Sequence, residues 1–218
     1  MNPHAIKINI GCGSAPTPGW KNYDNSPSVK LAKSPLKRLM LRSLGLLNAE
    51  QLKFIAMAKA ADIHFVNACS KIPEAHGSVE VIYSSHMLEH LDREKAAKFL
   101  REAFRVLAPG GIIRIAVPDI SYHVNNYLTH RDANRFIEDT FLTRPGHKNL
   151  FEKLIYLLIG DRHHLWMYDG PSLCKLLVGS GFSDAKELAE GTTRIADPGA
   201  LDLRERSPES VFVEAIKG

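Results

Sequence analysis

The feature that most constrains this chain is an apolar alternation at residues 6–10 that runs directly into a glycine turn. Isoleucines at positions 6, 8 and 10 follow the two-residue period of a β-strand, and Gly11 and Gly13 come immediately after it. Glycines let backbone N–H groups approach a ligand closely, and open α/β sheets bind cofactors outside the carboxyl ends of their strands. The stretch therefore predicts a first strand followed by a ligand loop.

An acidic residue and a proline refine the prediction of the ligand. Asp24 follows the loop at the end of an expected second strand, where a carboxylate can accept both hydrogen bonds of a ribose diol. Two glycines and an acid are a weak motif, and a simple turn with a surface aspartate is the alternative. A dinucleotide fingerprint requires glycine where this chain has Pro16, which argues against a pyrophosphate-containing cofactor such as NAD.

On these residues the chain resembles the class I S-adenosylmethionine (SAM)-dependent methyltransferases, and more narrowly their type 11-like group. The resemblance rests on Asn9-Ile10-Gly11-Cys12-Gly13, Gly19-Trp20, Asp24 and the stretch 79–91. It implies an α/β, three-layer Rossmann-like class I methyltransferase fold with a seven-stranded, mostly parallel sheet and an antiparallel last strand. It also implies SAM as cofactor and S-adenosylhomocysteine (SAH) as product.

The resemblance further implies which residues hold the cofactor. The glycine loop would lie against the amino-acid end of SAM, and Asp24 would hold the ribose. Asn67, at the end of an expected third strand over 62–68, would accept a hydrogen bond from the adenine amino group, the alternative being a solvent-facing polar residue. The family commonly has an acid at position 9, where the amide of Asn9 accepts a hydrogen bond but carries no charge. The candidate cofactor-binding residues are Asn9, Gly11, Cys12, Gly13, Asp24, Asn67, Ser84, Ser85 and His86.

The stretch 79–91 is the most specific part of the resemblance, a β-rich run that ends in polar residues. It contains the spacing His86-x-x-Glu89-His90, which occurs in metalloproteases with a third ligand downstream. We expect no metal, because the glycine loop and the strand order differ from those of metalloproteases. By analogy with the family, the polar end of the stretch borders the sulfonium of the cofactor.

A helix and a further strand are strongly indicated after this stretch. Asp92 can cap a helix whose apolar face recurs at 3.6-residue spacing, and Pro109-Gly110-Gly111 ends it. Residues 112–117 are then almost continuously apolar, as a strand buried on both faces requires. Asp119 follows as either a substrate contact or the cap of the next helix.

Two segments are predicted to be helical insertions in a single domain spanning residues 1–218. The first, at about 26–61, is amphipathic and carries seven lysines or arginines against Glu50. Its basic side is either simply solvated or holds an anionic substrate or a membrane surface. The second, at about 121–160, is expected to form two helices, of which 150–159 is too apolar to be freely exposed and would be a lid or a partner surface.

The loop 161–168 concentrates histidines and aromatic residues. We expect His86, His163 or His164 to act as the catalytic base, because imidazole can take a proton from an acceptor hydroxyl near neutral pH. The alternative is that a loop histidine is exposed or caps the helix expected near residue 171. The end of the chain is predicted to form two strands, at 183–190 and 210–216.

Composition limits the remaining possibilities. The chain has 218 residues and a net charge of +4, which neither demands nor excludes an anionic partner. We expect no binding to nucleic acid, because the basic residues are not interleaved with aromatic residues that could stack on bases. Three widely spaced cysteines and the lack of a signal peptide predict a cytoplasmic protein. The predicted function is methyl transfer from SAM to a small-molecule or saccharide acceptor. The alternatives are a non-catalytic SAM- or SAH-binding protein and, disfavoured by Pro16, a nucleotide-sugar or NAD-type enzyme.

Overall fold

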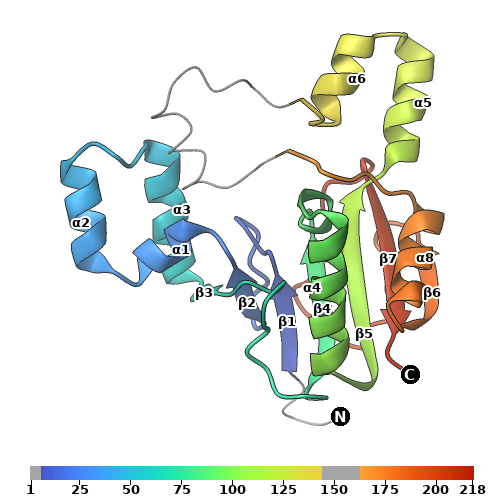
Figure 1. The fold of residues 1–218 in the computed structure, drawn as a ribbon, viewed down its shortest axis with the longest axis horizontal. Coiled ribbons are helices and arrows are strands. Elements are labelled where there is room, and N and C mark those ends of the chain that lie inside the picture. Colours follow the sequence, from blue (N-terminus) through green and yellow to red (C-terminus); the bar gives the residue numbers. More distant parts are fainter. Residues whose placement is uncertain (1–5, 144–162) are drawn as a thin grey trace.

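A seven-stranded mixed sheet forms the centre of the computed structural model, which describes residues 6–143 and 163–218 (Figure 1). The strand order is β3-β2-β1-β4-β5-β7-β6. Strand β7 pairs antiparallel with both of its neighbours and all other pairs are parallel, as the resemblance implies. The strands are β1 Ile6–Ile10, β2 Lys21–Asp24, β3 His64–Phe65, β4 Val79–Ser85, β5 Leu107–Pro118, β6 Ser183–Leu188 and β7 Ser210–Ile216.

Most of the described helices begin at a residue whose side chain caps them. Asp92 accepts a hydrogen bond from the backbone N–H of Lys95 at the start of α4, and Asp169 does the same from Ser172 at the start of α8. The described helices are α1 Pro27–Ala32, α2 Pro35–Ser43, α3 Ala49–Ala60, α4 Arg93–Val106, α5 Ile120–His130, α6 Ala133–Asp139 and α8 Gly170–Gly179, with a single 3-10 turn, η1, at Leu88–His90. None of the helices in the described ranges is long and apolar enough to cross a membrane.

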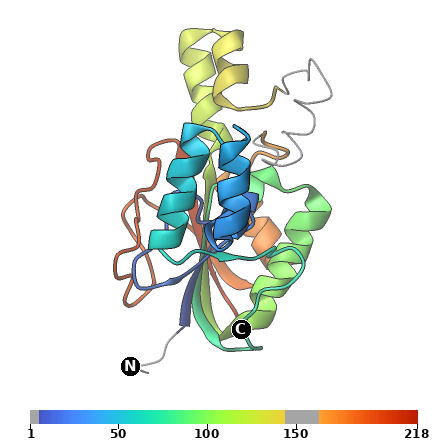
Figure 2. The same ribbon diagram turned by 90° about the vertical axis from the view of Figure 1, so that its left-hand side faces the viewer.

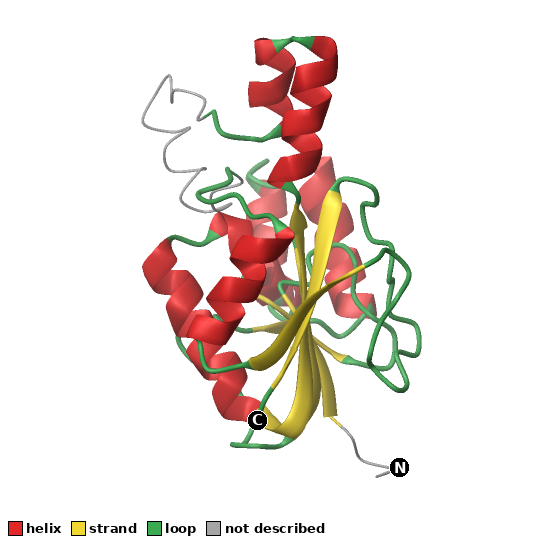
Figure 3. Cartoon of the chain, turned by 90° about the vertical axis from the view of Figure 1, so that its right-hand side faces the viewer, coloured by secondary structure: helices red, strands yellow, loops and turns green. Residues whose placement is uncertain are grey.

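The two faces of the sheet are covered differently (Figure 3). Helices α4 and α8 pack on one face, where Phe99, Leu100 and Leu173 are fully buried in the main hydrophobic cluster. Over the centre of the other face, the long connection between β6 and β7 takes the place of a helix, and its Ile195 and Leu201 join the cluster around β4, β5 and β7. Both faces are therefore dry, which explains why three consecutive residues of β1, from Ile8 to Ile10, are all buried.

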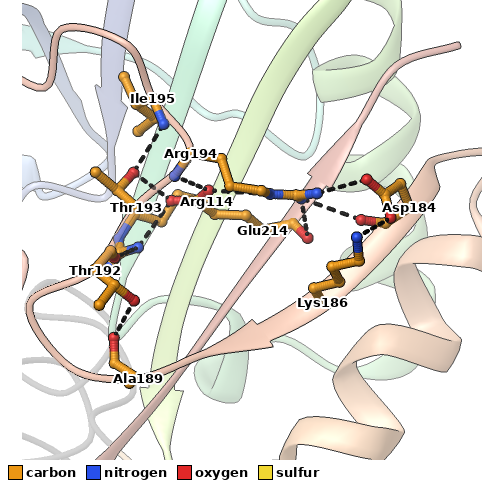
Figure 4. Close-up of polar contacts among 9 residues, drawn as sticks. All are labelled: Arg114, Asp184, Lys186, Ala189, Thr192, Thr193, Arg194, Ile195 and Glu214. Atoms are coloured by element: carbon orange, nitrogen blue, oxygen red, sulfur yellow. Dashed lines mark hydrogen bonds and ion pairs between the residues drawn. The ribbon is translucent and has the colours of Figure 1, made fainter.

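A buried ion pair fastens this connection to the sheet (Figure 4). Arg114 on β5 and Glu214 on β7 are both fully buried, with Nη1 and Oε1 2.8 Å apart. Arg114 also donates to the carbonyl oxygens of Thr192 and Leu203, and Glu214 accepts from the backbone N–H of Arg194. Two strands and the connection beside them are thus held by one charged network.

Helices α1, α2 and α3 lie at the β3 edge of the sheet rather than over its centre (Figures 1 and 2). Helices α1 and α3 pack together around Val29 and Ile55, and Cys12 of the glycine loop joins this cluster. Helix α2 extends beyond them and contains no buried residue. The segment 26–61 is helical, as its sequence predicts.

Several sequence-based boundaries are wrong. The third strand, expected over 62–68, is only His64–Phe65, because this edge strand is exposed on both faces and makes few pairings. Strand β5 begins at Leu107 and includes the Pro-Gly-Gly turn expected to precede it. The helix expected after Ser121 is two helices, α5 and α6, separated where Arg131 adopts a positive φ. The expected helix at 150–159 lies outside the described residues.

Candidate functional site

The glycine loop after β1 is shaped by close approach to Met87. A Cβ atom on Gly11, whose φ is +71°, would lie 2.6 Å from the Met87 Cγ, so no larger residue fits there. A Cβ atom on Gly13 would meet nothing within 4 Å, so the space beside Gly13 is open to a ligand. Gly11 is therefore needed for packing against Met87, whereas Gly13 leaves space for a ligand.

The N–H groups of this loop are satisfied internally, contrary to the expectation that they face a ligand. Gly11 and Cys12 both donate to the carbonyl oxygen of Tyr23 on β2, at 2.8 and 3.1 Å. The thiol of Cys12 lies in the cluster with α1 and α3, where burial, and secondly the Asp24 carboxylate, raise its pKa to about 12. Cys12 thus supports the loop from behind, and its side chain points into the protein.

Asp24 lies beside the loop at the carboxyl end of β2. Its Oδ2 accepts a hydrogen bond from the Gly13 backbone N–H at 3.0 Å, and its Oδ1 accepts one from Ser26 at 2.7 Å. Each carboxylate oxygen has a second lone pair, and the residue is 9% exposed at the edge of the core. The carboxylate is therefore held in a fixed orientation with acceptor capacity to spare.

Asn9 presents a buried acceptor without a donor. Its Nδ2 donates to the Thr17 Oγ1 at 3.0 Å and to the Ala15 carbonyl oxygen at 3.2 Å, whereas its Oδ1 has no hydrogen-bond partner among the described residues. A buried acceptor without a partner costs about 1–3 kcal/mol. An ammonium or hydroxyl donor of a ligand would satisfy it.

The remaining candidate cofactor residues divide into two groups. Ser84 and Ser85 end β4 beside the loop, and their buried hydroxyl groups have no partner within the described part of the chain. Asn67 is exposed after β3, and its Oδ1 accepts a hydrogen bond from the Cys69 backbone N–H at 3.2 Å. The Asn67 Oδ1, which is expected to accept a hydrogen bond from the adenine amino group, is thus already bonded within its own turn.

Beyond β4, three histidines surround the carboxylate of Glu89, which is 0% exposed. The Glu89 Oε1 lies 3.3 Å from His86 Nδ1 and 4.0 Å from the Nε2 atoms of both His90 and His164. His86 has a φ of +48°, a conformation that costs a non-glycine residue about 1–2 kcal/mol. His86 and Glu89 lie on either side of Met87 in the sequence, and Met87 is the residue that packs on Gly11.

The three expected catalytic histidines have different surroundings. The His86 Nε2 is 2.9 Å from the hydroxyl of Ser210 on β7. Burial lowers the pKa of His164 to about 4, so this imidazole is neutral near pH 7. His163 contributes its carbonyl oxygen, which accepts from the His90 Nδ1 at 3.0 Å. Neither loop histidine caps α8, because Asp169 does.

Glu89 and His90 are absent from the sequence-based site assignments. The signal that indicates them is the His86-x-x-Glu89-His90 spacing, which occurs in metalloproteases of a different fold. The third member, His164, lies far along the chain, and only the folded structure brings it to the cluster.

The carboxyl end of β5 contributes a further group of polar residues. Asp119 accepts from the Ser121 backbone N–H at 2.9 Å and so caps α5, one of its two expected roles. It also borders a pocket of about 250 Å³ between β5, β6 and β7. Ser210, the partner of His86, lines the same pocket, together with Glu187 and Glu190.

Comparison with known proteins supports the family resemblance. Residues 33–115 match a family described as a methyltransferase domain. No curated protein sequence is similar enough to match this chain.

Similar solved structures share the fold. They include SAM-dependent methyltransferases from Methanosarcina mazei (TM-score 0.54, 16% identity, covering 100% of this chain and 94% of the other) and Thermotoga maritima (0.53, 14%, 100% and 84%). Another, from Archaeoglobus fulgidus, has a TM-score of 0.52 at 14% identity and covers 99% of this chain and 87% of its own. At these identities the similarity establishes a class I methyltransferase fold.

The cofactor that the family match implies fits the residues at the carboxyl edge of β1, β2 and β4. The space beside Gly13 is open, the Asp24 carboxylate is held in a fixed orientation, and the Asn9 Oδ1 has no partner among the described residues. These features would give SAM room, an acceptor for its ribose hydroxyls and an acceptor for its ammonium group. The family match thus implies SAM as the cofactor, and these three residues would hold it.

Proposed function

We propose that this chain, a SAM-dependent methyltransferase by its family match and fold, methylates a small-molecule or saccharide acceptor. The observation that carries the proposal is the pocket of about 250 Å³ at the carboxyl end of β5. It is close to the size range of small-ligand sites. Asp119, Glu187 and Glu190 line it, and carboxylates accept hydrogen bonds from hydroxyl or ammonium groups.

When bound, SAM supplies a methyl group on a positively charged sulfur that leaves with the bonding electron pair as SAH. Holding the acceptor in line with that methyl group is the main task of the protein, and orientation alone can supply much of the rate. An acceptor hydroxyl that forms the new O–C bond also loses its proton. A base must receive that proton if the acceptor hydroxyl has a high pKa.

His86 is the best placed of the candidate bases. It lies at the end of β4 next to the residue that packs on the glycine loop, and it contacts Ser210 of the acid-lined pocket. His164 is less suited, because its lowered pKa of about 4 makes it a weak base. We assign His86 to proton transfer and treat residues 1–218 as one methyltransferase domain with two helical insertions.

The cofactor site is tested by calorimetry with SAH, SAM and NAD. Asp24→Ala should weaken SAH binding by about 1–3 kcal/mol, or roughly 5- to 150-fold, because it removes a carboxylate that accepts the ribose hydrogen bonds. The exposed aspartate Asp202 is a matched control, and Asp202→Ala should bind SAH normally. Equal affinity of the Asp24 variant and the control, or preferential binding of NAD, would contradict the assignment.

The reaction is tested by following SAM consumption with a panel of hydroxyl, amine and saccharide acceptors. SAH formation that depends on one acceptor class identifies the substrate. Tight SAH binding without turnover on any acceptor, including larger ones, favours the alternative of a non-catalytic SAM- or SAH-binding protein.

A surface contact is proposed for the first insertion. Helix α2 buries none of its residues, and Leu36, Leu39 and Met40 are 79%, 64% and 53% exposed. Lys37 and Arg38 on the same helix have no ion-pair partner among the described residues. An amphipathic helix with exposed leucines and unpaired basic residues has the chemistry that binds the surface of an anionic bilayer.

Not all basic residues of the insertion contribute to this surface. The Lys30 ammonium lies 3.8 Å from the centre of the Phe65 ring, and the Lys33 ammonium lies 3.7 Å from Asp62 and 3.0 Å from His64. These contacts direct both lysines to the β3 edge.

The membrane contact is tested by co-sedimentation with anionic and with neutral vesicles. Charge reversal at Lys37, Arg38 and Arg42 should remove about 1 kcal/mol of binding for each cation near the surface. Reversal of Lys95 and Lys98 on α4 is the control and should change little. Equal sedimentation of both variants and the wild-type chain would mean that α2 is simply solvated.

A further inference from the structure

The geometry around Glu89 points to a metal site: we propose that Glu89, His90 and His164 bind one divalent transition-metal ion. One ligand atom from each of these residues lies within 4.8 Å of the other two. The three come from the short turn η1 and from the loop before α8, so that two segments far apart in sequence meet at one point. The loop is joined to η1 by hydrogen bonds from the backbone N–H groups of Leu165 and Trp166 to the Glu89 carbonyl oxygen, at 2.8 and 3.1 Å.

The environment of the Glu89 carboxylate favours a metal ion. The residue is completely buried, and neither carboxylate oxygen has a hydrogen-bond partner among the described residues. An ionised carboxylate in such a place is costly unless it is paired or coordinates a metal. Within the described part of the chain, the groups closest to pairing with it are imidazoles, and these are also common metal ligands.

His90 is oriented as a metal ligand would be. Its Nδ1 lies 3.0 Å from the His163 carbonyl oxygen, to which only an N–H can donate. The proton on Nδ1 leaves a lone pair on Nε2, the atom that lies 4.0 Å from Glu89 Oε1. Metal-binding histidines are typically fixed in this way by a backbone carbonyl on the outer nitrogen.

The distances between the ligand atoms are also close to those of a metal site. Ligand atoms about 2.0–2.2 Å from a shared ion are about 3.4 Å from one another in a tetrahedral site. The separations of 4.0 Å from Glu89 to each histidine therefore need side-chain shifts of less than about 1 Å. Two imidazoles and one carboxylate suit zinc, cobalt, iron or manganese better than calcium, which prefers oxygen ligands only.

The position of the site suggests what the ion does, and this step rests on the proposed function. Met87, two residues before Glu89, packs on Gly11 of the cofactor loop, and His86 contacts Ser210 of the acid-lined pocket. An ion between these two regions would bind an oxygen of the acceptor and lower the pKa of its hydroxyl group. The acceptor is then a hydroxyl compound, and His164 is a ligand rather than a base.

The test uses the full chain, freed of metal with a chelator and titrated with Co²⁺ alone. Calorimetry gives the stoichiometry, and the visible absorption of bound Co²⁺ reports histidine ligation independently of activity. We expect one ion per chain, a higher melting temperature with metal, and affinity weakened at least about 100-fold in Glu89→Gln, which keeps the side-chain shape but removes the charge. His123→Gln, a change at a buried histidine on α5, is the matched control and should bind as the wild-type chain does.

The second variant, His164→Gln, keeps the test decisive if Glu89→Gln does not fold. Wild-type chain that binds no Co²⁺, or binds it as tightly after both changes, overturns the proposal. SAH binding is measured on the same samples. Normal SAH binding without Co²⁺ binding refutes the metal site alone, whereas Co²⁺ binding without SAH binding refutes the methyltransferase site and retains the metal.

Discussion

Replacing Glu214 by alanine should destabilise this protein far more than any surface charge change. Glu214 is fully buried and accepts hydrogen bonds from three donors: Arg114 Nη1 at 2.8 Å, Thr193 Oγ1 at 2.6 Å and the Arg194 backbone N–H at 2.9 Å. The Arg114 side chain is also fully buried, so removing the carboxylate leaves a guanidinium without its counter-charge inside the protein. Breaking one partner of a buried pair costs about 3–5 kcal/mol.

That loss is large compared with the usual total stability of about 5–15 kcal/mol. In a chain of this size it corresponds to a fall in melting temperature of very roughly 6–20 °C. The surface pair of Lys98 and Glu94, 2.7 Å apart and mostly exposed, provides the contrast. Glu94→Ala should change the stability far less than Glu214→Ala, because solvent screens such pairs.

Urea unfolding followed by circular dichroism measures both effects. The double variant Arg114→Met with Glu214→Leu separates the cost of an unpaired charge from the value of the pair, and it should be closer to wild-type stability than Glu214→Ala alone. A cost below about 1 kcal/mol for Glu214→Ala would refute the reasoning, because it would mean that water or a rearranged partner neutralises Arg114. A double variant as unstable as the single one would show that packing, rather than charge, is what matters.

Three further predictions concern the site. Gly11→Val should abolish SAH binding or folding, because its side chain would overlap Met87 and the φ of +71° is unfavourable for a branched residue. Gly179→Ala in α8 is the control and should affect neither SAH binding nor folding. Calorimetry measures SAH binding, and circular dichroism measures folding. His86→Gln should lower the single-turnover rate by about 10²–10⁴-fold while SAH binds normally, and an unchanged rate between pH 6 and 9 would show that positioning alone drives transfer. Burial raises the pKa of the Cys12 thiol from 9.0 to about 12, so between these values the folded chain keeps a proton that the unfolded chain loses. The stability that this group contributes should therefore decline as the pH rises from about 9 towards 12. Cys12 should also resist alkylation at about pH 8 until the chain unfolds.

Local patterns were sufficient to predict most of the sheet and its connections. The alternating isoleucines before Gly11, the acid at position 92 and the apolar run 112–117 each act through neighbours in sequence, so β1, α4 and most of β5 could be recognised without tertiary information. The Pro-Gly-Gly turn does not end before the strand as its sequence predicts, because pairing with β4 and β7 extends β5 back to Leu107. Strand β3 is shorter than its sequence predicts, because it lies at the edge of the sheet and pairs with a neighbour on one side only.

In the candidate site, too, some features are recognisable from local sequence and others depend on how the chain folds. The glycine loop, the acid that follows it and the histidines are all recognisable in the sequence, because they are particular residue types at short spacings. The folded chain is needed to show that two loop N–H groups donate to the Tyr23 carbonyl oxygen, that the Asn67 side chain bonds within its own turn, and that His164 lies beside Glu89. The physical reason is that hydrogen-bond partners and buried charges are set by which segments pack together, and the distance along the chain does not specify that packing.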